Sequence, residues 1–158
     1  LDDMAVFPFG RNDRKQPRMH GIRLDGKGDV TSTNHVWQRK DIGSFVPSPV
    51  AYQRRVYLVR DRGEIECVDS ATGETVWSDS LPKGRASYYA SPIIAGGILY
   101  ASREDGVVFV ASIADDRFEL LAENDMQEPV IGSPVPAHRC LLIRGQEHLY
   151  CFQTSEVE

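Results

Sequence analysis

A Ser-Pro pair followed by a branched apolar residue occurs three times in this chain at nearly constant spacing. The copies begin at Ser48, Ser91 and Ser133, so the period is 43 and then 42 residues. A repeat of this length is typical of arrays in which each period is one supersecondary unit. It therefore constrains the fold more than any other feature. Four further columns of the repeat are counted from each serine. Nine residues after it stand Tyr57, Tyr100 and Leu142, and fifteen residues after it stand Gly63, Gly106 and His148. Nineteen residues after it stand Cys67, Val110 and Phe152, and twenty-nine residues after it stand Trp77 and Leu120.

The unit within one period consists of short strands joined by tight turns. In the best-preserved copy, Gly96-Gly97 and Asp105-Gly106 are the residues that hairpin turns with positive φ require. Helical periodicity is not convincing anywhere in the chain. Four antiparallel strands in about 43 residues match one blade of a β-propeller, so we predict an all-β fold. The predicted strands of this copy are residues 91–95, 98–102, 107–111 and 118–122.

The repeat divides the chain into two whole blades and two partial ones within a single propeller-type domain, residues 1–158. Such an array is an incomplete ring and exposes apolar blade faces at both ends. The chain begins with Leu1 and carries no signal-peptide pattern. We therefore expect that further blades complete the ring in a longer protein, or that two copies associate. The whole blades are residues 41–84 and 85–127, the partial blades are residues 1–40 and 128–152, and residues 153–158 form a tail.

The last hairpin departs from the repeat. Its column places His148 where the other units have glycine, and histidine adopts a left-handed conformation poorly. An alternative register, with Gly145-Gln146 in the turn, would put Cys140 opposite Cys151 and allow a cross-strand disulfide. The repeat register separates these two residues. We therefore favour the interpretation that Cys140, Cys151 and Cys67 are all buried and reduced in apolar strands.

The stretch from Cys67 to Trp77 reads as a strand end, a tight turn and the start of the next strand. Asp69 can accept hydrogen bonds from amides two or three residues on, and Gly73 can supply a positive φ. The stretch resembles the tryptophan-docking motif of quinoprotein (PQQ-like) β-propeller repeats, in which Ala, Asp, Thr-Gly and Trp recur at this spacing; Cys67 stands where Ala is usual. The resemblance implies about three and a half blades. The predicted structural docking residues are Asp69, Thr72, Gly73, Trp77 and, in the first unit, Trp37.

Composition excludes several classes of function. The formal net charge of -5 gives no electrostatic reason to expect nucleic acid as a partner. No apolar run is long enough for a transmembrane helix, and Gly26-Lys27-Gly28 is too short for a phosphate-binding loop. The histidines show no ligand spacing, so we expect surface or turn positions and no metal for all four of them: His20, His35, His138 and His148.

The resemblance raises the question of an enzyme. Quinoprotein dehydrogenases of this family hold their cofactor between a Trp and a vicinal Cys-Cys ring, with calcium and an Asp base. This chain has no adjacent cysteines, and Trp37 and Trp77 match the docking position. We therefore expect no cofactor and no catalytic, cofactor-binding or metal-binding residue here. The alternative is a fragment of a quinoprotein dehydrogenase whose cofactor site lies in other blades.

The favoured interpretation is a non-enzymatic binding or scaffold module that contacts a protein partner. The resemblance extends to the propeller lipoprotein of the bacterial outer-membrane assembly machinery, which implies a periplasmic or otherwise extracytoplasmic location. Propellers place variable loops around the ring and bind through them. As a solvated loop the basic cluster needs no further explanation, and an interaction loop on the rim is the alternative; the tyrosine pair is equally suited to packing between blades. The candidate interaction residues are Arg11, Arg14, Lys15, Arg18, Tyr88 and Tyr89.

Overall fold

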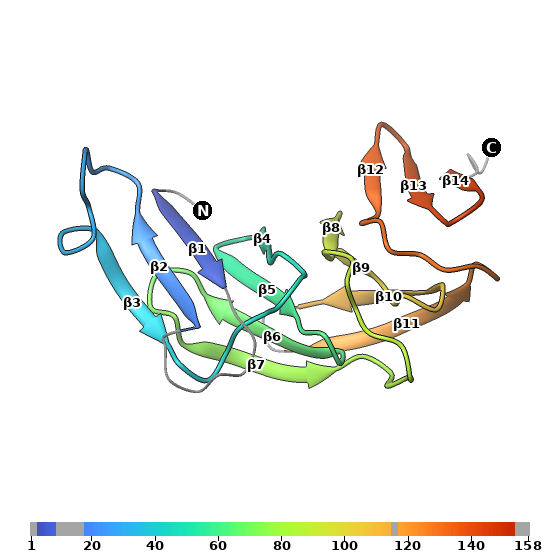
Figure 1. The fold of residues 1–158 in the computed structure, drawn as a ribbon, viewed down its shortest axis with the longest axis horizontal. Helices are drawn as coiled ribbons and strands as arrows, with labels where there is room; N and C mark the ends of the chain where they lie inside the picture. The colour runs from blue at the N-terminus through green and yellow to red at the C-terminus, as the bar shows by residue number, and fades with distance from the viewer. Residues whose placement is uncertain (1–2, 9–17, 115–116, 154–158) are drawn as a thin grey trace.

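A computed structural model describes residues 3–8, 18–114 and 117–153. Over these residues the chain forms four antiparallel sheets in chain order, which follow one another along an open arc (Figure 1). The outer sheets have three strands each and the two inner sheets have four. Within the described ranges, no helix is long and apolar enough to cross a membrane. The all-β fold of propeller-like blades in an incomplete ring is thus confirmed.

The first two sheets occupy the N-terminal half. The first contains β1 (Met4–Pro8), β2 (Met19–Arg23) and β3 (His35–Arg39). The second contains β4 (Val50–Tyr52), β5 (Arg55–Val59), β6 (Glu64–Asp69) and β7 (Thr75–Ser80).

The other two sheets follow towards the C-terminus. The third contains β8 (Ile93–Ala95), β9 (Ile98–Ser102), β10 (Val107–Ile113) and β11 (Phe118–Asp125). The fourth contains β12 (Val135–Ala137), β13 (Cys140–Arg144) and β14 (Leu149–Gln153).

The turns of the third sheet form where the sequence predicts them. Ala95 pairs with Ile98, so Gly96 and Gly97 make a two-residue hairpin with φ of 58° and 79°. The β9–β10 turn ends at Gly106 with φ 101°. Positive φ at these positions costs glycine nothing, so the predicted turn chemistry is confirmed.

The core lies between neighbouring sheets, so each sheet packs mainly on the next one along the chain. One apolar cluster joins the first and second sheets around Met19 and Leu58, and another joins the second and third around Tyr57 and Phe109. The third and fourth sheets share a smaller cluster. Its buried members are Val108, Val130 and Ile143.

The last hairpin is one residue shorter than its counterparts. Leu142 pairs with Cys151, whereas the repeat columns would pair it with Phe152. The amide of Gly145 donates to the carbonyl of His148 over 2.9 Å, which leaves two residues in the turn. His148 therefore needs no positive φ, and the position that demanded glycine has disappeared from this turn. The repeat column that makes Phe152 the equivalent of Cys67 and Val110 was therefore wrong by one residue, because Cys151 occupies that position.

The shorter hairpin also decides the cysteine question. Cys140 pairs with Gln153, not with Cys151, and all three cysteines are free thiols. Cys67 is buried as predicted, but Cys140 is half-buried and Cys151 is exposed. The prediction of burial was wrong for these two: Cys140 lines an open cleft between the third and fourth sheets, and no further sheet among the described residues covers Cys151.

Candidate functional site

The predicted docking turn forms between β6 and β7. The carboxylate of Asp69 accepts the amides of Ala71 and Thr72 at 3.0 and 3.1 Å. Arg55 donates to its other oxygen over 2.7 Å. Burial opposes ionisation of Asp69, but the two amides and the guanidinium outweigh it and hold its pKa below the ordinary value. Gly73 closes the turn with φ 74°.

Trp37 of the first sheet lies on this turn of the second sheet. Its Nε1 donates to the carbonyl of Ser70 over 2.9 Å, and the side chain is only 9% exposed. A Cβ added at Gly73 would lie 2.5 Å from the indole, and one added at Gly21 would lie 2.2 Å from it. The indole is therefore held between two glycine backbones, and no other residue type fits at either position without displacing it.

Trp77 docks one sheet further along in a similar way. Its Nε1 donates to the carbonyl of Ala114 in the β10–β11 connection over 3.3 Å. Its ring contacts Tyr57 and Phe118, with centroids 5.9 and 6.2 Å away. Both tryptophans thus contact a neighbouring sheet.

Hydrogen bonds between serines join the segments that precede β4, β8 and β12, and sequence reasoning missed this serine ladder. The amide of Ser48 donates to Oγ of Ser91 over 2.9 Å, and the amide of Ser91 donates to Oγ of Ser133 over 3.0 Å. The Ser-Pro repeat had served only as a marker of the period. A serine recurring once per blade beside the first strand was the available signal, because a hydroxyl can accept from a neighbouring repeat.

The structure describes three of the six candidate interaction residues: Arg18, Tyr88 and Tyr89. Arg11, Arg14 and Lys15 of the predicted interaction loop lie outside the described residues. Arg18 is 5% exposed, so this member of the loop offers little surface to a partner.

Tyr88 is a packing residue. Its side chain is 1% exposed, its hydroxyl donates to the carbonyl of Pro82 over 2.9 Å, and its ring lies 5.7 Å from that of Phe109. Burial raises the pKa of Tyr88 to about 12. Tyr89 beside it is half-buried. Of the two interpretations that the sequence left open for Tyr88, packing between sheets fits these contacts.

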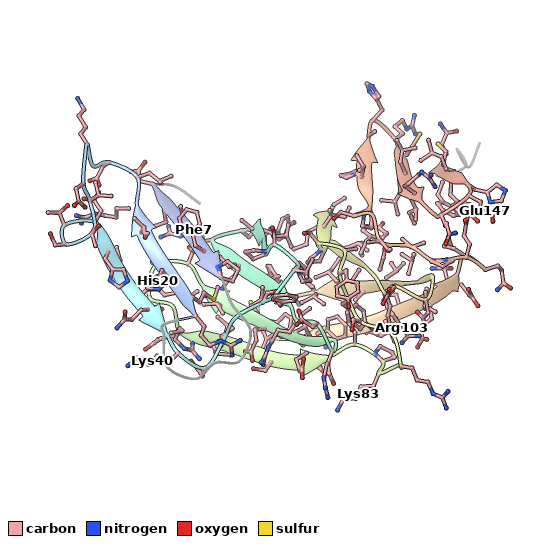
Figure 2. All side chains as sticks on the ribbon, viewed as in Figure 1. Phe7, His20, Lys40, Lys83, Arg103 and Glu147 are labelled. Carbon is pink, nitrogen blue, oxygen red and sulfur yellow. The ribbon has the colours of Figure 1, made fainter. Side chains whose placement is uncertain are left out.

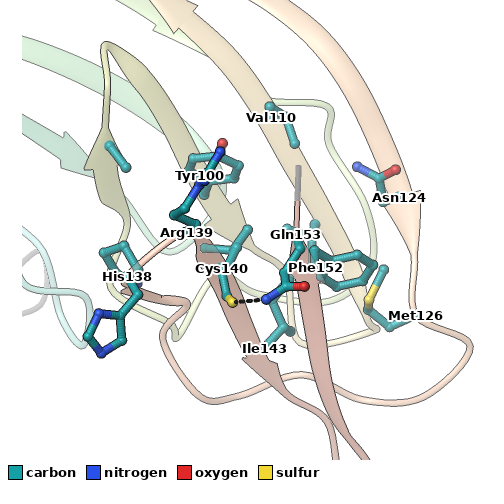
Figure 3. Close-up of a pocket in the computed structure, with 14 residues that line it drawn as sticks. Tyr100, Val110, Asn124, Met126, His138, Arg139, Cys140, Ile143, Phe152 and Gln153 are labelled. Carbon is teal, nitrogen blue, oxygen red and sulfur yellow. Dashed lines mark hydrogen bonds between the residues drawn. The ribbon is translucent and has the colours of Figure 1, made fainter. Parts of the chain in front are cut away.

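An apolar cleft of about 410 Å³ lies between the third and fourth sheets (Figure 3). At the preceding interface Phe118 of β11 packs on Trp77, whereas the fourth sheet, as far as the described residues show it, has three strands and no counterpart of β11. At the mouth, Nε2 of Gln153 donates to Sγ of Cys140 over 3.0 Å. The strand count of the last sheet explains this cleft without a ligand. Its apolar walls include Tyr100, Val108, Val110, Met126, Ile143 and Phe152.

A second hollow, of about 470 Å³, opens on the edge of the arc beside the β5–β6 turn. We call its three cations the basic rim: Arg62, Lys83 and Arg85, all exposed. Figure 2 shows Lys83 projecting from this edge. Within the described part of the chain, none of the three forms an ion pair, and Glu64 is the carboxylate that lines the same hollow.

Four arginines in other parts of the chain each lie beside an aspartate, whereas the three rim cations form no ion pair among the described residues. These pairs are Arg23–Asp25, Arg39–Asp41, Arg55–Asp69 and Arg103–Asp105. Three unneutralised cations on a chain of net charge -5 make a local site for an anionic group.

Two exposed apolar side chains lie in a loop that contacts the β5–β6 turn. Phe45 and Val46 are 46% and 47% exposed. The amide of Phe45 donates to a carboxylate oxygen of Asp61 over 3.3 Å, which ties this loop to the turn that carries Arg62. Aromatic and arginine side chains together are enriched at protein interfaces, so this edge has the composition of a protein-binding surface.

A carboxylate in the last interface is fully engaged. Glu128 accepts the amides of Glu147 and His148, Nδ1 of His148 at 3.0 Å and the hydroxyl of Tyr150 at 2.7 Å. The Glu147 amide is the main cause that lowers the pKa of Glu128 from 4.5 to about 2. Glu128 therefore caps the shortened β13–β14 turn and holds the fourth sheet on the third.

The histidines are not all scattered. His20 and His35 meet in the first sheet, with Nδ1 of the first 2.8 Å from Nε2 of the second. His138 lies in the β12–β13 turn with φ 54°, and His148 lies against Glu128. Sequence reasoning missed the pair because 15 residues separate its members, and only the pairing of β2 with β3 brings them together. No group of three or more His, Cys, Asp and Glu in the described residues could hold a metal ion.

These features define a class: a β-propeller array whose blades are joined by docked tryptophans. Residues 23–79, which contain both Trp37 and Trp77, match the family described as outer membrane protein assembly factor BamB. This match spans residues 23–79, and over that segment the chain is similar to PQQ-like repeat β-propellers. No curated protein sequence matches it.

Solved structures show the same architecture. BamB from Moraxella catarrhalis superposes with a TM-score of 0.60 and 17% identity, covering 85% of this chain and 39% of that one. Quinohemoprotein alcohol dehydrogenase ADHIIG from Pseudomonas putida HK5 gives 0.60 and 12%, covering 90% and 27%. The computationally designed Ika4 protein gives 0.62 and 15%, covering 96% and 92%. The chain thus spans well under half of either natural relative, and at these identities the likeness concerns the fold alone.

Proposed function

We propose that this chain is a non-enzymatic scaffold module that binds a protein partner through the basic rim and the neighbouring Phe45 and Val46. The observation that carries the proposal is the set of three exposed cations, without ion-pair partners among the described residues, around one hollow. The family match over residues 23–79 supports a protein-binding role and an extracytoplasmic location. We also propose that the chain divides into blades with boundaries between residues 40 and 41, 84 and 85, and 127 and 128.

The chemistry of the surface specifies the partner. Unpaired cations favour carboxylates, and an adjacent apolar pair favours leucine or an aromatic side chain. The partner segment is therefore acidic with an apolar anchor. Exposed charges at the edge of an interface act mainly on association rate and salt dependence, while the apolar contacts supply desolvation.

Fluorescence anisotropy with a labelled peptide of alternating Glu and Phe, titrated with the full chain, tests this function. We expect Lys83→Glu and Arg85→Glu to weaken binding about tenfold each and to reduce its salt dependence. Lys27→Glu is the matched control, because this exposed lysine lies in the loop between β2 and β3 and carries the same charge. Equal loss in Lys27→Glu would show that net charge alone drives binding.

The alternative is a segment of a quinoprotein dehydrogenase, a class of protein whose blades share this fold. Its cofactor site would lie in other blades of a longer protein. Absorbance of the full-length protein with added pyrroloquinoline quinone and calcium separates the two functions. A stoichiometric bound quinone would overturn the scaffold proposal.

A further inference from the structure

Two imidazole rings on the first sheet converge on one point. Nδ1 of His20 in β2 and Nε2 of His35 in β3 are 2.8 Å apart, with ring centroids 5.0 Å apart and an interplanar angle of 67°. Only one hydrogen can lie between the two nitrogens, so one ring donates and the other offers a lone pair. The backbone of two paired strands therefore holds two good ligand atoms close together.

The pair lies on the face of the first sheet that points away from the second sheet. Met19 is fully buried against the second sheet, and Gly21 lies against Trp37. Side chains alternate along a strand, so His20, between Met19 and Gly21, points to the opposite face. His35 is paired with Ile22 and is exposed, which places both rings within reach of solvent. Figure 2 labels His20 in this sheet, at one end of the arc.

We propose that His20 and His35 chelate a divalent transition-metal ion, with water in the remaining coordination positions. Imidazole nitrogen suits Zn²⁺, Ni²⁺ and Cu²⁺, whereas Mg²⁺ and Ca²⁺ prefer oxygen ligands. At metal–nitrogen distances of about 2.1 Å, two adjacent ligand nitrogens lie roughly 3.0–3.4 Å apart. The two nitrogens must separate by about half an ångström, and the rings must rotate so that both lone pairs converge on the ion; an exposed ring such as His35 can do so.

The exchange requires no other reactant. Both facing nitrogens must offer lone pairs, so the proton between them moves to the far nitrogen of the same ring, and the ion takes its place. Because the strands already hold the second ring near the first, the second bond forms at high effective concentration. Such a gain is worth about a hundredfold in affinity.

Isothermal titration of the untagged full chain with NiCl₂ and with ZnCl₂ tests the site. We expect one equivalent to bind, and we expect His20→Gln and His35→Gln each to weaken binding about a hundredfold. His138→Gln is the matched control, because Gln53 already occupies the same position of the β4–β5 hairpin with φ 47°. MgCl₂ should give no binding heat.

Three results would overturn the proposal: no binding of either ion by the native chain, undiminished binding in both variants, or an equal loss in His138→Gln. Thermal unfolding without metal checks that each variant folds. If one of them does not, imidazole ¹H–¹⁵N spectra of the native chain decide the matter. Ni²⁺ must broaden the ring signals of His20 and His35 first, and earlier broadening of another histidine excludes the pair.

Discussion

Replacing Trp37 by alanine tests the docking geometry most directly. The indole is 9% exposed, lies between the backbones of Gly21 and Gly73, and donates to the carbonyl of Ser70 over 2.9 Å. Truncation removes the contact with both glycines and the hydrogen bond together. The free energy of unfolding should therefore report how much one docked indole contributes to joining the first and second sheets.

The magnitude follows from burial. Truncating a buried Trp to Ala costs about 3–5 kcal/mol, and the lost hydrogen bond contributes about 1 kcal/mol of such a change. We expect a loss near the upper end, about 4–5 kcal/mol, because the facing glycines have no side chains that could fill the space. For a domain with about 5–15 kcal/mol of stability, this is a third or more of the total.

Urea denaturation followed by circular dichroism measures the effect. Val36→Ala is the matched control, because Val36 is adjacent in the strand but 46% exposed, and it should cost less than about 1 kcal/mol. Gly73→Ala should also destabilise the fold, through its positive φ and through the clash with the indole. In a Trp37→Ala background only the strain of φ remains, so the double variant should be more stable than the sum of the single effects predicts.

Two results would refute this reasoning. A loss for Trp37→Ala within about 1 kcal/mol of that for Val36→Ala would mean that the indole is not buried between sheets. Strict additivity of Trp37→Ala with Gly73→Ala would mean that the indole and Gly73 do not touch.

Three further predictions concern the turns and the ladder. Gly106→Ala should cost about 2 kcal/mol more stability than Gly28→Ala. Both glycines have positive φ, but only at Gly106 would the added Cβ lie 2.2 Å from a backbone oxygen, that of Glu128. Equal unfolding midpoints of the two variants in urea would contradict this. The pKa of Glu128 is lowered from 4.5 to about 2, so its stabilisation is complete above pH 4.5 and is lost as the pH falls towards 2; Glu128→Gln should lack that part of the pH profile, and parallel profiles would count against it. Ser91→Ala should cost about 1–2 kcal/mol and speed amide exchange at Ser48, while unchanged protection there would argue against the ladder.

Much of the fold could be predicted from the sequence because its determinants are local. Asp69 and Gly73 define their turn within five residues, and the repeat sets which strands pair. The error in the last hairpin has the same origin. The columns assumed a constant turn length, but the β13–β14 turn is one residue shorter. A deletion at a turn shifts every later column without changing the apolar pattern that identifies the strand.

The candidate sites could not be predicted because they depend on packing between segments distant in sequence. Arg62 lies in the β5–β6 turn, whereas Lys83 and Arg85 lie in the β7–β8 connection, and only the fold brings them to one hollow. His20 and His35 meet through strand pairing across a loop of unpredictable length. The sequence left rim recognition and packing between blades open for Tyr88, because a tyrosine hydroxyl can be buried if it finds a partner, and the carbonyl of Pro82 is that partner here.

The successive docking of sheet on sheet makes this chain a nearly one-dimensional cooperative system. In such arrays, stability is the sum of terms for each unit and for each nearest-neighbour interface. Trp37 and Trp77 strengthen the first two interfaces, whereas the third depends on the smaller cluster of Val108, Val130 and Ile143 and on Glu128. Partial unfolding should therefore begin at β12–β14 and stop at the Trp77 interface. Amides of the fourth sheet should exchange by this local opening, and those of β5, β6 and β9 only by global unfolding.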